Sequence, residues 1–108
     1  MGLPYLPSMY KNFSHLQVDK LLANRLRLAI LASVSHSDEV DFTSLRQAVK
    51  TTDGNLSVQL GLLQDAGWII VKKLAEGNRP QTIVALTNKG RTAIDAYRNL
   101  IDGWFAND

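Results

Sequence analysis

Two histidines are the first residues to consider for chemistry, because imidazole acts both as a metal ligand and as a proton carrier. His15 and His36 lie 21 residues apart in a chain without cysteine, and neither has a second ligand at metal-site spacing. Asp38, Glu39 and Asp41 form a short acidic run typical of a solvated turn. The Gly-x-Ser-x-Gly, phosphate-loop and Gly-x-Gly-x-x-Gly motifs do not occur. We therefore expect no enzyme activity, no metal and no cofactor.

A second group of candidate residues can contact nucleic-acid bases. It consists of Thr52, Asn55, Ser57, Val58 and Gln59. Asparagine and glutamine amides pair with adenine, a serine hydroxyl bonds to bases or phosphate, and valine contacts the thymine methyl group. In the simpler interpretation, Asn55 and Ser57 only cap the first turn of a helix.

Positive charge is concentrated in the same part of the chain. Residues 43–91 carry a net charge of +4, whereas residues 1–42 and 92–108 carry 0 and −2. The cations expected to contact DNA phosphates are Arg46, Lys50, Lys72, Lys73 and Arg79. Because Lys72 and Lys73 are adjacent on a predicted strand, their side chains point to opposite faces and only one is expected to reach DNA.

Residues 53–66 contain neither Lys nor Arg, so the commonest contact to guanine is unavailable there. Three interpretations remain open. The DNA site is A·T-rich and read partly by shape, or specificity is low, or this face binds a protein.

Periodicity predicts the elements that position these residues. Helices are expected at about 14–23, 25–35, 44–50, 53–66 and 88–105, a short strand at 40–42, and a hairpin of 68–75 and 81–87 around a loop at 77–80. The expected caps are a Ser14-to-Gln17 capping box, Asn24, Thr43 and Thr87. Leu56, Leu60 and Leu63 form the buried stripe of the 53–66 helix, and Gly67 ends it.

Length and composition agree with a single domain. The chain has 108 residues, of which 45% are apolar and 20% charged. We expect an arm at 1–13 and one domain at 14–108. No apolar run approaches a membrane span, and prolines interrupt the N-terminus where a signal peptide needs an apolar core, so no membrane association and a cytoplasmic location are expected.

The element order predicts an α+β, mostly helical fold: a winged helix-turn-helix with the helix-turn-helix at 43–67, the wing at 68–87 and a C-terminal helix at 88–106. In this architecture one helix fits the major groove while the hairpin follows phosphates. The unit from Thr43 to Thr87 is expected to present one continuous cationic ridge around an exposed helix.

The sequence also resembles a known family over residues 19–98. The segments that carry the likeness are Arg25–Leu31, Asp41–Leu45, Thr52–Ser57, Ala66–Trp68, Arg79–Thr82 and Leu86–Arg91, with Leu60 and Leu63. They are similar to small stand-alone winged-helix regulators related to the multiple-antibiotic-resistance (MarR) type. The resemblance implies a dimeric DNA-binding regulator that reads DNA with the 53–66 helix and the wing at 76–80.

The N- and C-terminal helices carry more apolar residues than one small domain can bury, which favours a homodimer interface. The expected interface residues are Leu21, Leu28, Tyr97, Leu100, Ile101, Trp104 and Phe105.

These observations favour a homodimer that binds double-stranded DNA and represses transcription. The alternative is a protein-interaction module that uses the same face, with Val58 and Leu62. A third interpretation is a sensor with a pocket for an unidentified small-molecule effector between the dimer helices and the DNA-binding lobes.

Overall fold

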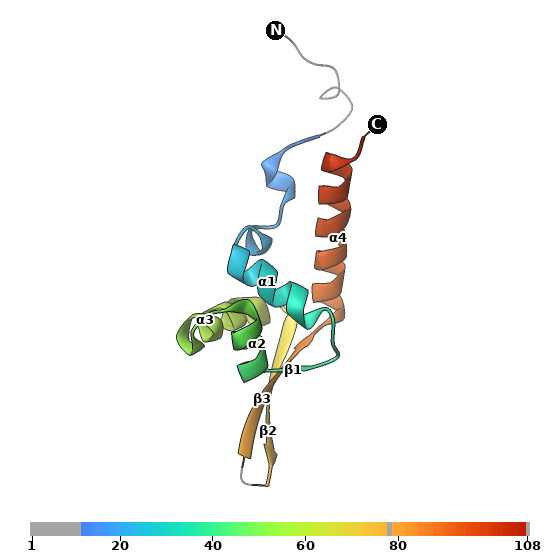
Figure 1. Cartoon of the computed structure of the whole chain (residues 1–108). Helices are drawn as coiled ribbons and strands as arrows, with labels where there is room; N and C mark the ends of the chain where they lie inside the picture. Colours follow the sequence, from blue (N-terminus) through green and yellow to red (C-terminus); the bar gives the residue numbers. More distant parts are fainter. Residues whose placement is uncertain (1–11, 78, 108) are drawn as a thin grey trace.

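A computed structural model describes residues 12–77 and 79–107. The elements are the 3-10 turns η2 (His15–Gln17) and η3 (Lys20–Leu22), helix α1 (Arg25–Val34), strand β1 (Val40–Asp41), helices α2 (Phe42–Val49) and α3 (Asp53–Asp65), strands β2 (Ile69–Glu76) and β3 (Arg79–Leu86), and helix α4 (Asn88–Phe105). Helices α1 to α3 gather at the base of the β2–β3 hairpin, which projects to one side, while α4 runs away in the opposite direction (Figure 1). The predicted α+β winged helix-turn-helix is confirmed.

The N-terminal helix predicted at 14–23 is wrong, because this segment forms two separate 3-10 turns. The Ser14 hydroxyl accepts from the backbone N–H of Leu16 rather than completing a capping box with Gln17. Val18 is extended, and the Asp19 carboxylate accepts from the N–H of Leu21 at 2.9 Å. Asp19 thus begins a second turn, and the segment does not form one continuous helix.

The caps of α1 and α2 show one confirmed prediction and one correction. The Asn24 side chain accepts from the N–H of Arg27 at 2.9 Å, as predicted. The cap predicted at Thr43 is wrong: α2 begins at Phe42, and Asp41 accepts from the N–H of Ser44 at 3.1 Å. The pairing of Asp41 with Ile83 holds the backbone of Asp41 extended, as an N-cap residue requires. Its carboxylate therefore caps the first turn of α2, and Thr43 lies inside the helix.

The sheet has three antiparallel strands in the order β1-β3-β2. The register runs from Ile69 opposite Leu86 to Glu76 opposite Arg79, so the strands extend further than predicted and residues 77–80 are not all loop. Gly77, with φ of +60°, begins the short connection. Pro80 is tolerated in β3 because β1 pairs only with residues 83 and 84, leaving no third strand beside it.

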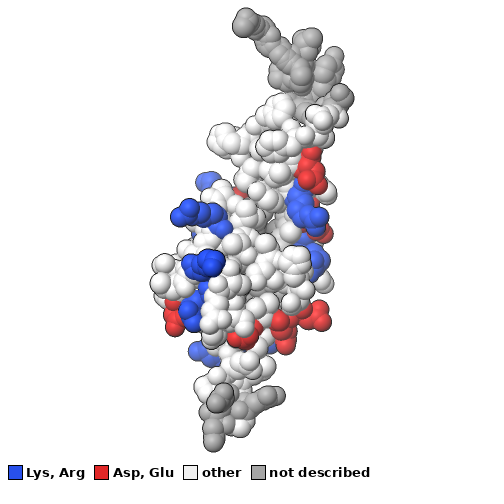
Figure 2. Space-filling view, in the orientation of Figure 1, with Lys and Arg blue, Asp and Glu red and all other residues white. Residues whose placement is uncertain are grey.

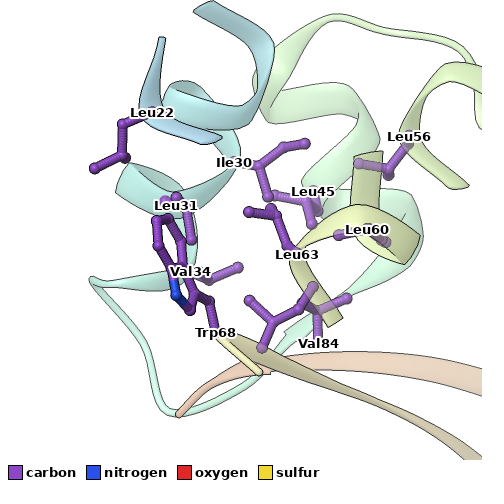
Figure 3. Close-up of a cluster of buried hydrophobic side chains, with 11 residues drawn as sticks. Leu22, Ile30, Leu31, Val34, Leu45, Leu56, Leu60, Leu63, Trp68 and Val84 are labelled. Carbon is purple, nitrogen blue, oxygen red and sulfur yellow. The ribbon is translucent and has the colours of Figure 1, made fainter. Parts of the chain in front are cut away.

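The hydrophobic core lies between the three helices and one face of the sheet (Figure 3). Its buried members are Leu22, Ile30, Leu31, Val34, Leu45, Leu56, Leu60, Leu63, Trp68, Ile69 and Val84. The stripe predicted for α3 is therefore confirmed, and the helix terminates before Gly67, whose φ is +80°. This packing fixes which side of α3 faces outward.

Helix α4 is anchored at its start. The Thr87 hydroxyl accepts from the N–H of Gly90 at 3.0 Å and donates to the Gly67 carbonyl at 2.6 Å. Gly90 is required there, since a Cβ would overlap the Trp68 carbonyl oxygen. Among the described residues, no helix is both long and apolar enough to cross a membrane.

Candidate nucleic-acid interface

Helix α3 has one side exposed to solvent along its length. Leu56, Leu60 and Leu63 are buried, whereas Val58 is 61% and Leu62 43% exposed. The other exposed residues of α3 include Gly54, Asn55, Ser57 and Gly61. The helix is thus held by one face and presents the other, which is the arrangement a groove-binding helix needs.

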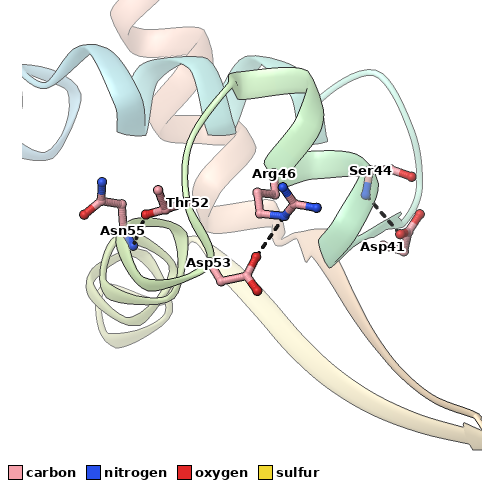
Figure 4. A network of polar contacts seen from close by, with 6 residues as sticks. All are labelled: Asp41, Ser44, Arg46, Thr52, Asp53 and Asn55. Carbon is pink, nitrogen blue, oxygen red and sulfur yellow. Dashed lines mark hydrogen bonds and ion pairs between the residues drawn. The ribbon is translucent and has the colours of Figure 1, made fainter.

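The first turn of α3 is capped by Thr52, whose hydroxyl accepts from the backbone N–H of Asn55 at 3.2 Å (Figure 4). The side chains of Asn55 and Ser57 make no hydrogen bond with any residue in the described part of the chain. The simpler interpretation, in which these two side chains serve as caps, does not hold. Their amide and hydroxyl remain available to a ligand.

An open groove of about 500 Å³ separates α3 from the wing. Ser57 and Gly61 line it from α3, and Lys73 and Thr82 line it from the strands. Asp53 and Asp65 also line it, so this groove holds both signs of charge. Lys73 faces α3, as the alternation of the strand requires, while Lys72 lies on the other face and pairs with Glu39 at 3.6 Å.

The remaining cations lie in two further places. The Arg46 Nε is 2.8 Å from the Asp53 carboxylate, which offsets its charge at the start of α3 (Figure 4). Lys50 lies with Arg25, Thr51 and Asn55 in a groove of about 470 Å³ where α1, α2 and α3 meet.

Figure 2 shows positive side chains over α2 and α3 and, separately, along α4, with negative ones among them. The prediction of one continuous cationic ridge is therefore wrong, because the carboxylates of Glu39, Asp53 and Asp65 lie among the cations. The side chain of Arg79 lies outside the described residues, so its predicted contact remains a prediction.

Two arginines were missed by the sequence analysis. Arg27 donates to the Gln59 side-chain oxygen at 2.7 Å and to the Leu21 carbonyl at 2.8 Å, which ties α3 to the N-terminal segment. Gln59 thus has an internal partner, although its DNA contact remains a prediction. Arg25 joins Lys50 only through tertiary packing. No local pattern links residues this far apart in the chain.

The predicted dimer residues divide into two sets. Leu21, Leu28 and Tyr97 are half-buried and pack against the domain's own core. Leu100, Ile101, Trp104 and Phe105 lie further along α4. There the Trp104 indole N–H donates to the Asn12 carbonyl at 2.9 Å, while Phe105 is 81% exposed.

A groove of about 530 Å³ lies between α1 and α4. Its lining combines apolar residues such as Leu28 and Ile94 with His36, Arg91 and Arg98. Asp95 lines the same groove, so both signs of charge lie beside its apolar residues.

Comparisons with known proteins agree with this geometry. The family described as winged helix DNA-binding domain matches residues 26–103. An uncharacterized protein of Methanocaldococcus jannaschii, MJ0432, is 35% identical over 78 residues, which cover 72% of this chain and 85% of that protein.

Many solved structures share the fold, and transcriptional regulators are among them. A transcriptional regulator homologue from Pyrococcus horikoshii OT3 is 24% identical with a TM-score of 0.67, covering 80% of this chain and 89% of that one. A MarR-family transcriptional regulator from Silicibacter pomeroyi is 22% identical with a TM-score of 0.58, covering 85% and 66%.

Proposed function

This chain belongs to the winged helix DNA-binding domain family, and from that premise we propose that it is a homodimeric transcriptional regulator whose α3 enters the major groove of double-stranded DNA. The observation that carries the proposal is the free outer side of α3 beside the projecting β2–β3 hairpin. Asn55, Ser57 and Val58 are the proposed base contacts. Gln59 can use both atoms of its amide on a base only when the bond from Arg27 to its side-chain oxygen opens.

The phosphate contacts are proposed from the cations around α3. Lys50 and Lys73 make no ion pair within the described residues, so their charge is available to DNA. Arg46 and Arg79 are the further proposed contacts, whereas Lys72 is directed to the opposite face of β2 and is paired with Glu39. Phosphate contacts by side chains on a small domain fix its position on the duplex.

A salt titration tests DNA binding. Fluorescently labelled random duplexes are titrated with wild type, Lys73→Glu and Lys72→Glu at several salt concentrations. We expect a log–log slope of several units for wild type, a slope smaller by about 1 for Lys73→Glu, and nearly the wild-type slope for Lys72→Glu, the matched control. Failure to bind the duplexes in a salt-dependent way would refute the proposal and leave the protein-interaction alternative, which rests on exposed Val58 and Leu62.

The dimer is proposed to form along α4 and the N-terminal segment. Phe13 and Leu16 are exposed on the N-terminal segment and Phe105 is exposed on α4, and the Phe13 and Trp104 rings are 6.4 Å apart. A second copy would cover these side chains and place two α3 helices about 34 Å apart on one face of the DNA. Sedimentation should show a dimer for wild type and a monomer for Phe105→Asp, with Leu74→Asp on the wing as the control. An unchanged dimer in Phe105→Asp would place the interface elsewhere.

Repression is the proposed outcome of binding, because a dimer that occupies a promoter excludes polymerase from it. We place the protein in the cytoplasm, where it acts on the chromosome. The groove between α1 and α4 is the proposed site of a small-molecule effector, since two arginines, Arg91 and Arg98, line it together with apolar residues and can pair with an anion despite the nearby carboxylate of Asp95. A thermal-shift screen of small aromatic carboxylates, repeated with Arg98→Gln, tests this assignment.

A further inference from the structure

The exposed side of α3 carries small and apolar residues, whereas a DNA-reading helix usually carries cations there. Gly54, Val58 and Gly61 follow one another at spacings of four and three residues, so they lie on one face. Val58 is 61% exposed, and Leu62 beside it is 43% exposed. This face therefore offers methyl groups and bare backbone to whatever approaches it.

Nothing within the described residues requires glycine at positions 54 and 61. A Cβ at either position would meet nothing within 4 Å. Neither residue has a positive φ, unlike Gly67 and Gly77. Glycine is the poorest helix former after proline, so both residues weaken α3 without relieving any contact inside the domain. What a glycine offers at such a position is room for another surface to approach the helix backbone closely.

If α3 enters the major groove, the approaching surface is formed by base edges, and their chemistry indicates which bases fit this face of the helix. Guanine presents two acceptors there, and an apolar side chain against them leaves both without a partner. Thymine presents a methyl group, which an exposed valine can bury. The free amide of Asn55, three residues before Val58, suits the N6 and N7 edge of adenine.

We propose that α3 selects A·T pairs by burying thymine methyl groups against Val58, with Gly61 allowing the helix backbone to approach the bases. This inference deepens the proposed function and rests on it. Val58 is then a specificity-determining residue, while affinity comes from the cations on the phosphates. Leu62 lies one turn further along and extends the apolar contact.

The test removes only the methyl group. A tight-binding duplex is selected from random 24-base-pair sequences and resynthesised with uracil in place of thymine, one position at a time. We expect A·T pairs at the enriched positions and a loss of about fourfold in affinity at one or two thymines in each half-site. Val58→Ala should abolish this thymine-to-uracil difference, and Ile70→Ala, an exposed apolar residue on β2, should preserve it.

Gly61→Ala provides an independent readout. The added methyl group favours the helix and meets open space, so the melting temperature should rise by about 4 °C while affinity for the selected duplex falls. A merely structural glycine would not raise stability and lower binding together. Unchanged affinity in this variant would refute the close approach.

The remaining outcomes separate the two proposals. Salt-dependent binding without enrichment of any sequence, or with no effect of uracil, would overturn the thymine inference and leave DNA binding in place. Failure to bind any duplex would overturn both. A tight salt-insensitive complex with a protein through Val58 and Leu62 would also overturn both.

Discussion

The pair between Arg46 and Asp53 makes a quantitative prediction about DNA binding. Arg46 Nε lies 2.8 Å from the carboxylate, whose side chain is 78% exposed at the start of α3. Asp53→Asn removes the negative charge with little change in shape. Arg46 then has no carboxylate partner within the described residues and is free to contact a phosphate.

The magnitude follows from counterion release. One additional phosphate contact steepens the log–log salt slope by about 0.9, which corresponds to about a fivefold gain in affinity near 0.15 M salt. The substitution also removes an acidic side chain from the first turn of α3, where it stabilises the helix dipole by about 0.3–1 kcal/mol. Binding should therefore improve although stability falls slightly.

Fluorescence anisotropy at four salt concentrations measures the slope, and thermal unfolding measures the stability. Asp102→Asn is the matched control, since it removes the same charge from the exposed side of α4. We expect its slope to equal that of wild type. A slope for Asp53→Asn no steeper than the control's would show that Arg46 and the start of α3 do not face DNA.

Three further predictions concern stability. Hydrogen bonds from the Ser44 hydroxyl and backbone N–H hold the pKa of Asp41 below its ordinary value, so its stabilising effect should be full above about pH 4 and lost as the pH falls through the lower folded pKa. In urea unfolding, Asp41→Ala should cost about 1 kcal/mol at pH 7, and the difference from wild type should shrink at low pH. Leu63→Ala should cost about 2–5 kcal/mol because the side chain is fully buried, whereas the neighbouring Leu62→Ala should cost below about 1 kcal/mol. Gly90→Ala should destabilise by about 1–3 kcal/mol, because its Cβ meets backbone that cannot move away; an unchanged melting temperature would contradict this packing.

Local signals predicted the elements well wherever one strong pattern acted alone. The leucine spacing of α3 and the caps at Asn24 and Thr87 depend only on neighbours within a few residues. The predictions at residues 14–23 and Thr43 were wrong because the carboxylates of Asp19 and Asp41 accept from the backbone N–H groups of Leu21 and Ser44 and so begin a new turn at each aspartate. Both aspartates are evident in the sequence. Whether they, rather than a neighbouring residue, cap the turn depends on an extended backbone just before it, which the sequence does not specify.

The candidate interface was predictable only in part. Alternation along a strand correctly separated Lys72 from Lys73. The partners of these cations were not predictable, because Glu39 is far from Lys72 in the chain and meets it only through the fold. The same holds for Gln59, whose amide oxygen is engaged by an arginine 32 residues away.

The sequence by itself determined the order of the helices and strands from Asn24 onward, the buried side of α3 and the absence of cations on that helix, since each follows from residue type and short-range spacing. Only the tertiary structure decided which cations are offset by carboxylates, which polar side chains stay free, and that Gly54 and Gly61 face open space. Periodicity specifies a direction from a helix axis, whereas charge pairing and empty volume depend on what distant segments bring to the same place.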